Sequence, residues 1–438
     1  MTRATIVLSL CFVTACTSPG AEETGGGATS AGATTGGETT GDEPTGITTG
    51  PALPDGCDVL VLGAEDGAAG LQAAIDASTP GTTICLRGQF AGTATIGAMN
   101  AVDLTLRGVD AGEGIGAGAV IDFGRTGGAP GLRFESVNGL TIENVSVIGT
   151  QGDGVVVSGG EDVTLRRVKV GWDGPNSGAE LFAIRADNLT QVLVDECEAS
   201  GGRDAGIFVQ QSEAVIVRGS LAYANVSGIE IENCAGADVH DNEAHDNVIG
   251  LFVLDLPDTP FGNGGDVLVR DNHSHDNNAE NFAEPGSVVA SIPEGIGALV
   301  LATDRVELRG NTIAGNATSG ALIVSFAVVE LLSGMSHDDP DYDGYPQTVE
   351  IHDNTFTGNG TMPAMLLAQV FMLEQGPAIL WDGAFDEMLP DPAFGLCVRG
   401  NGDADFLNLD ALHGGADKST DLAPHDCDHP DVPAVDPG

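Results

Sequence analysis

Two glutamates two residues apart, Glu230 and Glu232, have the spacing in this sequence that best suits acid–base chemistry. They stand in the alternating run Ile229-Glu230-Ile231-Glu232, which is typical of a strand with one buried face. Both carboxyls then point the same way, roughly 7 Å apart by strand rise, and that separation fits an inverting glycoside hydrolase. The alternative is that both are solvated strand residues of a very acidic protein. The sequence leaves the two interpretations open.

The same alternation in neighbouring repeats places further side chains on this stripe. We therefore predict four catalytic candidates, namely Glu230, Glu232, Arg185 and Asp187. Side chains that would contact a ligand beside them are Phe208, Gln210, Phe252 and Trp172. Exposed phenylalanines on a thin solenoid need either a cover or a ligand. Aromatic rings and carboxylates under flanking loops would form a sugar-binding groove.

A repeat of 22 residues positions these side chains. Gly206, Gly228 and Gly250 open three successive units that share two short alternating runs separated by Gly, Asn and Asp. Periods of this length indicate a solenoid in which each repeat packs on its neighbours. Stacked strands at about 4.8 Å give an all-β parallel β-helix. We expect about ten coils and, by the general rule for parallel crossovers, a right-handed winding.

Asparagines recur at fixed positions after the strands. One column holds Asn242, Asn272, Asn311 and Asn354, and a second holds Asn225, Asn247, Asn277, Asn316 and Asn359. Asparagine tolerates left-handed turn geometry, and stacked amides can bond one another along a ladder. We interpret both columns as turn architecture and not as a binding site.

The chain divides into four predicted parts. Residues 1–15 have the basic start and apolar run of a secretory signal, and Val13-Thr14-Ala15-Cys16 resembles the bacterial lipobox. Cys16 would then be the lipidated N-terminus, which predicts a lipid-anchored protein of the bacterial cell envelope. Residues 16–54 are a Gly- and Thr-rich tether. Residues 55–376 form the β-helix, starting with a capping helix at Gly67–Ser78 that Asp66 caps, and residues 377–438 form an irregular C-terminal cap.

Six further cysteines follow the predicted lipidation site. Because exported chains form disulfides, we pair Cys57 with Cys85 and Cys397 with Cys427. Cys197 and Cys234 fall in different columns of the repeat and are expected to be buried free thiols. Spacing alone does not fix this connectivity.

An acidic loop matches the spacing of a calcium-binding loop. The residues are Asp339, Asp341, Asp343, Tyr345 and Glu350, with Gly344 at the position of the sharp turn. Oxygens at one, three and five with a glutamate at twelve are the ligands of an EF-hand. Pro346 and the strand that Glu350 opens depart from that pattern. Bound Ca²⁺ and a plain acidic surface loop stay open as alternatives.

Histidines on adjacent coils form a second candidate metal site. His245 and His275 share a column, with His273 nearby and an aspartate after each of the pair. Stacked imidazoles about 5 Å apart could bind copper or zinc. The alternative is that these His-Asp pairs are hydrogen-bonded turn structure, since three convergent ligands do not follow from the sequence.

The charge of the chain restricts its partners. The sequence holds 64 acidic and 16 basic residues, a formal net charge of −48. Nucleic-acid binding requires a basic surface, so we exclude it. A polyanion would be repelled unless divalent cations bridge it. The remaining candidates are neutral glycans, cations, or polyuronates with calcium.

Residues 181–353 resemble the bacterial family of parallel β-helix repeat-containing proteins, within the pectin-lyase-like superfamily. The phrases that carry the resemblance are DAGIFVQQSEAVIVRG, SGIEIENCAGADVHDN and GLFVLDLP. It implies the fold but no particular activity. We expect a polysaccharide-binding protein, with processing by a lyase, epimerase or hydrolase as a further option. A non-catalytic surface or scaffold protein and a periplasmic metal-handling protein stay open.

Overall fold

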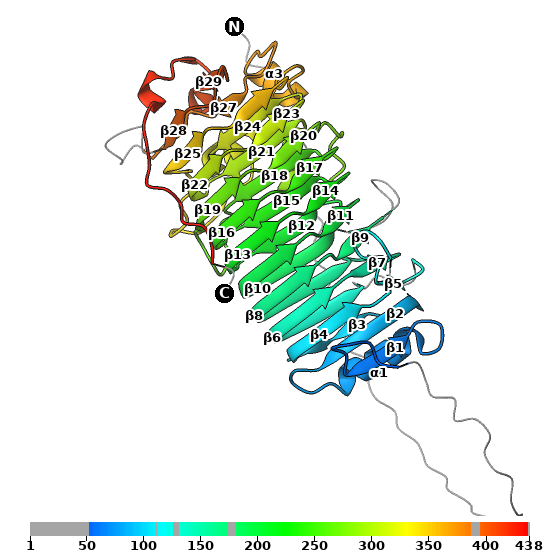
Figure 1. Cartoon of the computed structure of the whole chain (residues 1–438). Helices are drawn as coiled ribbons and strands as arrows, with labels where there is room; N and C mark the ends of the chain where they lie inside the picture. Colours follow the sequence, from blue (N-terminus) through cyan, green and yellow to red (C-terminus); the bar gives the residue numbers. More distant parts are fainter. Residues whose placement is uncertain (1–51, 111, 126–130, 173–180, 387–394, 437–438) are drawn as a thin grey trace, which may run out of the picture. The chain divides into compact units, whose positions relative to one another are not determined.

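The computed structural model describes residues 52–110, 112–125, 131–172, 181–386 and 395–436. The predicted signal, Cys16 and most of the tether lie outside these residues. Leu53–Gly438 forms one compact unit, in which the chain winds through rows of parallel strands that stack coil upon coil (Figure 1). The predicted parallel β-helix is confirmed. No helix in the described part of the chain is long and apolar enough to cross a bilayer.

Three rows of strands form the faces of the solenoid. The first row contains the starts of the long strands β6 (Leu132–Glu143), β8 (Val155–Arg166) and β10 (Phe182–Asp195), together with β3 (Ile96–Met99), β12 (Ala205–Gln210), β15 (Ser227–Glu232), β18 (Ile249–Leu254), β21 (Ile296–Leu301), β24 (Ser319–Val324), β27 (Ile379–Trp381) and β29 (Phe406–Asn408).

The second row contains the ends of those long strands and the start of β2 (Thr83–Ala91), together with β1 (Val59–Leu62), β4 (Val102–Gly108), β13 (Glu213–Arg218), β16 (Ala235–His240), β19 (Gly265–Arg270), β22 (Asp304–Arg309), β25 (Val349–His352) and β28 (Leu396–Arg399). The third row contains the end of β2, β5 (Ala119–Asp122), β7 (Val145–Ile148), β9 (Lys169–Gly171), β11 (Glu198–Ser200), β14 (Leu221–Tyr223), β17 (Glu243–His245), β20 (His273–His275), β23 (Thr312–Ala314) and β26 (Thr355–Thr357).

The opening glycines of the repeat lie one above the other. A Cβ on Gly206 would come within 2.9 Å of the Gly228 carbonyl oxygen, and one on Gly228 within 2.5 Å of the Gly250 carbonyl oxygen. Only glycine fits so close an approach of successive coils. The 22-residue spacing in the sequence therefore corresponds to the true coil register.

The asparagine columns are hydrogen-bonded ladders. The Asn247 side chain donates to the Asn277 side-chain oxygen at 2.9 Å, and Asn277 donates to Asn316 at 3.1 Å. These three residues are fully buried, so each amide satisfies its neighbour. We expected the asparagine itself to adopt the left-handed conformation. The residue before it does so instead. Asp246 and Asp276 have φ of 55° and 52°, which aspartate tolerates better than most residues.

Helix α1 (Gly67–Asp76) covers the N-terminal end of the solenoid, with Leu71 and Ile75 buried. We expected the Asp66 side chain to cap this helix, but it makes no capping hydrogen bond. Its carboxylate instead accepts the Leu62 backbone amide at 2.8 Å. The disulfide Cys57–Cys85 ties the segment before α1 to β2. The open apolar end of the solenoid is thereby closed.

Inserted segments build a second apolar cluster outside the first row. It joins η1 (Val289–Ser291), α2 (Phe326–Ser333) and α3 (Met365–Val370) to outward side chains of the strands, among them Phe252 and Leu299. The main core instead lies inside the coils and is filled by Val, Ile, Leu and Ala. The outer face of β18, β21 and β24 is thus covered by the inserts.

The strand rows continue beyond Pro377, where the sequence pattern decays. β27, β28 and β29 pair in parallel with β24, β25 and β27. The chain after them contains η3 (Ala411–His413) and η4 (Ala423–His425) and runs back along the second row (red in Figure 1).

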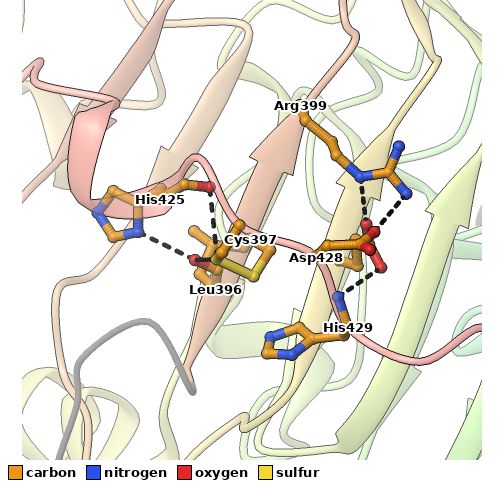
Figure 2. Close-up of a disulfide and its surroundings, with 8 residues drawn as sticks. Leu396, Cys397, Arg399, His425, Asp428 and His429 are labelled. Atoms are coloured by element: carbon orange, nitrogen blue, oxygen red, sulfur yellow. Dashed lines mark hydrogen bonds and ion pairs between the residues drawn. A yellow bond between two sulfur atoms is a disulfide. The ribbon is translucent and has the colours of Figure 1, made fainter.

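The disulfide Cys397–Cys427 fixes that returning segment. Figure 2 shows it beside His425, whose Nδ1 lies 3.0 Å from the Leu396 carbonyl oxygen. Further along, Arg399 pairs with Asp428 at 3.0 Å (Figure 2). Cys197 and Cys234 are free and buried.

Candidate functional site

The parallel register places the predicted stripe in two adjacent columns of the first row. Arg185, Phe208, Glu230 and Phe252 are successive partners across β10, β12, β15 and β18, and Asp187, Gln210, Glu232 and Leu254 form the second column. The columns are two residues apart, so they share one side of the sheet. Their inward neighbours, such as Ile207 and Ile229, lie in the main core.

We expected this stripe to be exposed along its length, and that prediction is wrong. Phe208, Glu230 and Phe252 are 3%, 2% and 1% exposed. Phe252 packs in the outer cluster beneath η1 and α2. Phe208 stacks on Phe182 with ring centres 4.4 Å apart. The inserts cover Phe252 and Phe182 covers Phe208, so both outward phenylalanines have the cover that they require.

Trp172 lies elsewhere. Its ring is buried in the main core, and its indole N–H donates to the Thr150 hydroxyl at 3.1 Å. It therefore packs the inside of a coil and does not border the stripe. Residues 173–180 of the insert that follows it lie outside the described part of the chain.

One part of the stripe is partly exposed to solvent, and Arg185 lies at its centre. Its guanidinium lies 3.3 Å from the Asp187 carboxylate and 5.2 Å and 5.9 Å from the centres of the Phe182 and Phe208 rings. About a quarter to a third of the Arg185 and Asp187 side chains is exposed. Cation–π contact with two rings holds the guanidinium against the sheet.

Besides Asp187, the charge of Arg185 acts on the carboxyls of Asp153, Asp204 and Glu232, and the charges of Asp204 and Glu232 act in turn on Glu230. We refer to Asp153, Asp204, Glu230 and Glu232 as the carboxyls of one group. With Arg185 they form what we call the Arg185 cluster. Burial, together with repulsion from Asp204 and a smaller effect of Asp187, raises the pKa of Glu232 to about 7, although Arg185 opposes the shift. Burial and the charge of Asp153 raise the pKa of Asp204 to about 6.

Glu230 forms the floor of the Arg185 cluster. Burial first, and then the charges of Asp204 and Glu232, raise its pKa well above the ordinary range. Its Oε2 has no hydrogen-bond partner among the described residues. Ser227 opposes this rise in pKa through a side-chain hydrogen bond, but burial outweighs it because a buried carboxyl is far more stable protonated than ionised. Glu230 therefore keeps its proton to a higher pH than an ordinary glutamate, and the pKa of Glu232 lies near neutral.

Sequence reasoning missed Asp153 and Asp204. Both lie in the turns that lead into first-row strands, and Asp153 accepts the Phe182 backbone amide at 3.1 Å. Each is an aspartate followed by a small residue and an apolar strand, a pattern common in turns. Only the lateral stacking of coils shows that they face Arg185.

The arrangement can perform acid–base chemistry. A carboxyl that titrates near the working pH both donates and accepts protons efficiently. Pairs of carboxyls whose surroundings separate their pKa values are typical of such sites. Two surface depressions of about 490 and 290 Å³ lie elsewhere, beside Asn188 and beside Arg399. Neither contains a comparable group of shifted carboxyls.

The predicted calcium loop has its oxygens bonded within the protein. Asp339 accepts the backbone amides of Asp341 and Asp258, and Asp343 accepts that of Tyr345. Glu350 lies in β25, away from the turn, where it accepts from Arg399 at 2.7 Å and from the His429 backbone amide. The structure does not bring Glu350 to the loop aspartates, and calcium binding here stays a prediction.

His245 and His275 stack as adjacent rungs of the third row, with ring centres 5.2 Å apart. His273 lies closer to His275, at 4.1 Å between ring centres. The predicted column is therefore present, and a third histidine joins it.

Solved structures with a similar fold differ widely in sequence. The Dettilon tailspike protein is 11% identical with a TM-score of 0.42. The match covers 72% of this chain but only 61% of the tailspike protein, less than two thirds of its length. The A-module of the Azotobacter vinelandii mannuronan C-5 epimerase AlgE6 is 17% identical with a TM-score of 0.46, over 76% of this chain and 90% of its own. The alginate lyase of Paenibacillus sp. str. FPU-7 is 14% identical with a TM-score of 0.42, over 70% and 99%.

Similarity at this level concerns the fold and says nothing of what this chain binds. No curated protein matches the sequence. Residues 130–261 match the family described as the right handed beta helix region, and this part of the chain is accordingly a right-handed parallel β-helix.

Proposed function

We propose that the protein binds a polysaccharide on the open part of its first-row face, beside Arg185, and performs acid–base chemistry on it at the Arg185 cluster. One observation carries the proposal. The coil register gathers Glu232, Asp204 and Arg185 on one side of the sheet, partly open to solvent, over a floor of Glu230 and Phe208. Burial keeps these carboxyls protonated to unusually high pH, which suits proton donation to a leaving oxygen.

The electrostatics favour a neutral glycan over a polyuronate. The cluster offers one guanidinium against several carboxyls, and the whole chain has a formal net charge of −48. A polyanionic substrate would meet repulsion from both. A neutral sugar can accept a proton from Glu232 while Arg185 and Gln210 donate hydrogen bonds to its hydroxyls.

The roles of the residues follow from their exposure and charge. Glu232, which is partly exposed, is the proton donor, and Asp204 is the nearby carboxyl that ionises first as the pH rises. Arg185 is a positioning residue that also lowers the pKa of both. Glu230 is too deeply buried to touch a substrate and acts through its neighbours.

A glycan array followed by product analysis tests this proposal. We expect retention of a neutral polysaccharide and the appearance of new reducing ends. Unsaturated products that depend on added calcium would instead indicate a lyase acting on a polyuronate. Retention without any product would leave a binding protein, and absence of retention by any glycan would contradict the proposal.

A non-catalytic surface protein is the second candidate. The burial of Glu230 and Phe208, and of Phe252 in the cluster that the inserted segments build, favours it, because covered side chains stiffen a solenoid without meeting a ligand. The two candidates differ at Glu232. A non-catalytic protein shows no turnover in either form, and Glu232→Gln then changes stability alone.

We further propose that the protein acts outside the cytoplasm, anchored through Cys16. The two disulfides support an oxidising location. Cys16→Ser should release the protein from the membrane fraction, whereas retention of this variant in that fraction would contradict a lipid anchor.

A further inference from the structure

The third row of strands carries a group of side chains that the proposed function does not use. β17 and β20 lie side by side and in parallel, with Glu243 opposite His273 and His245 opposite His275 (Figure 1). The residues between them, Ala244 and Ser274, are fully buried. By strand alternation the four flanking side chains therefore point outward.

Three of these side chains converge. His275 Nε2 lies 3.2 Å from Glu243 Oε1, and the rings of His273 and His275 stack with centres 4.1 Å apart. One ligand atom from each of Glu243, His273 and His275 lies within 4.8 Å of the other two. Within the described part of the chain, these three residues form the one group of His, Cys, Asp or Glu side chains whose ligand atoms lie close enough together to hold an ion.

We propose that Glu243, His273 and His275 bind a divalent transition-metal cation, with Zn²⁺ as the first candidate. Two imidazoles and a carboxylate are a ligand set that zinc accepts, with a fourth position left for water. Ligand atoms about 2.1 Å from zinc in a tetrahedron lie about 3.4 Å from one another. Small rotations of the three side chains, which are partly exposed, would bring their ligand atoms from within 4.8 Å to this spacing.

A carboxylate behind His275 orients it for this role. Asp276 Oδ2 lies 2.9 Å from His275 Nδ1, so Nδ1–H donates to Asp276 and Nε2 faces Glu243. A metal-binding histidine is commonly held in this way by a carboxylate at its other nitrogen. His245 stacks between His275 and Tyr223, with ring centres 5.2 and 5.5 Å away, and limits rotation of the His275 ring.

The His-Asp pair alone does not make the site. His240 pairs with Asp241 at 2.7 Å in the same local geometry, but it lies in the second row without a second histidine beside it. The pairing is thus a feature of the turns. What distinguishes His275 is the presence of His273 and Glu243 at ligand distance.

Calorimetric titration of the tag-free chain with ZnCl₂ in excess Mg²⁺ tests the proposal, because Mg²⁺ occupies nonspecific acidic sites. We expect one Zn²⁺ per chain. His273→Ala and His275→Ala should each weaken binding more than tenfold, and Glu243→Gln should weaken it in the same direction. His240→Ala is the matched control and should leave the affinity unchanged. None of the four side chains belongs to the buried core, so circular dichroism should show an unaltered fold.

Asp276→Asn separates a positioned site from surface attraction. We expect a loss of about 10- to 100-fold in Zn²⁺ affinity, as for other groups that orient a ligand. Co²⁺ should give the visible absorption of a tetrahedral complex, and His275→Ala should abolish it. Absence of stoichiometric binding, or binding that survives both histidine substitutions, would overturn the proposal.

Discussion

Glu230 lies directly opposite Phe208 in the parallel register of β15 and β12, and the two side chains are 2% and 3% exposed. A carboxyl in this setting has no water to stabilise its charge. Its pKa is accordingly raised well above the ordinary value, first by burial and then by Asp204 and Glu232. The packing of successive coils therefore favours the protonated form of the acid at the floor of the Arg185 cluster.

Glu230→Gln tests this preference for the protonated form. Because the folded-state pKa is raised, the stability that the protonated carboxyl contributes is lost as the pH rises through that pKa. Glutamine cannot ionise, so the variant should unfold at a higher temperature than the wild type at pH 8 and at a similar one at pH 5. Glu213→Gln, on the exposed part of β13, should show no such difference. A Glu230→Gln variant destabilised equally at both pH values would contradict a raised pKa of Glu230.

The whole protein should lose stability as the pH rises from about 4 to about 7. Burial raises the pKa of Asp255 and of Asp304 to about 7, and that of Asp382 to about 6. A raised pKa favours the folded state at low pH, and this stabilisation falls by about 1.4 kcal/mol per group for each pH unit between the unfolded and the folded pKa. Thermal unfolding should show a falling midpoint over this range. Asp255→Asn should flatten the profile, and a midpoint that rises with pH would refute this explanation.

The asparagine ladder should be a principal source of cooperativity. Asn247→Ala removes the acceptor of the Asn225 backbone amide at 2.9 Å and the donor to Asn277. Buried polar groups left without partners cost roughly 1–3 kcal/mol each. We therefore expect the free energy of unfolding, measured with urea, to fall by roughly 3 kcal/mol. Glu213→Ala serves as an exposed control. A loss below about 0.5 kcal/mol for Asn247→Ala would mean that the ladder is energetically minor.

The disulfide at the C-terminal end should hold the returning segment on the second row. Beyond Cys427, the Val432 backbone amide donates to Glu307 at 2.7 Å, so a few contacts continue the attachment. Replacing Cys397 and Cys427 with alanine should cost about 2–4 kcal/mol and expose residues 411–436 to protease. The other disulfide should be unaffected. Equal protease resistance of variant and wild type would show that the ion pairs of Arg399 suffice.

The repeat and its columns could be predicted from the sequence because each depends on local periodicity. The 22-residue spacing, the outward and inward positions of the first row, and the asparagine ladders are all visible in the order of residues. Burial of the outward positions could not be predicted in the same way. Phe252 is covered by η1 and α2, which are separated from it by tens of residues and have no period that places them.

The candidate site shows the same division. Glu230, Glu232 and Arg185 follow from alternation within a coil, whereas Asp153 and Asp204 belong to turns and meet Arg185 only through stacking. Glu350 is the opposite case. Its spacing fits a calcium loop, but a strand that must pair with β28 directs it to Arg399. At Glu350, strand pairing overrides the loop spacing.

The most direct test of the central claim is the release of reducing ends from a retained neutral polysaccharide by the wild type and by Glu232→Gln. We predict activity that falls as the pH rises above about 7, where the carboxyl of Glu232 loses its proton, and a roughly 10²- to 10⁴-fold lower rate in the variant with glycan retention unchanged. Glu213→Gln should keep the wild-type rate. Equal rates for Glu232→Gln and the wild type would contradict the assignment of the Arg185 cluster as the site of chemistry.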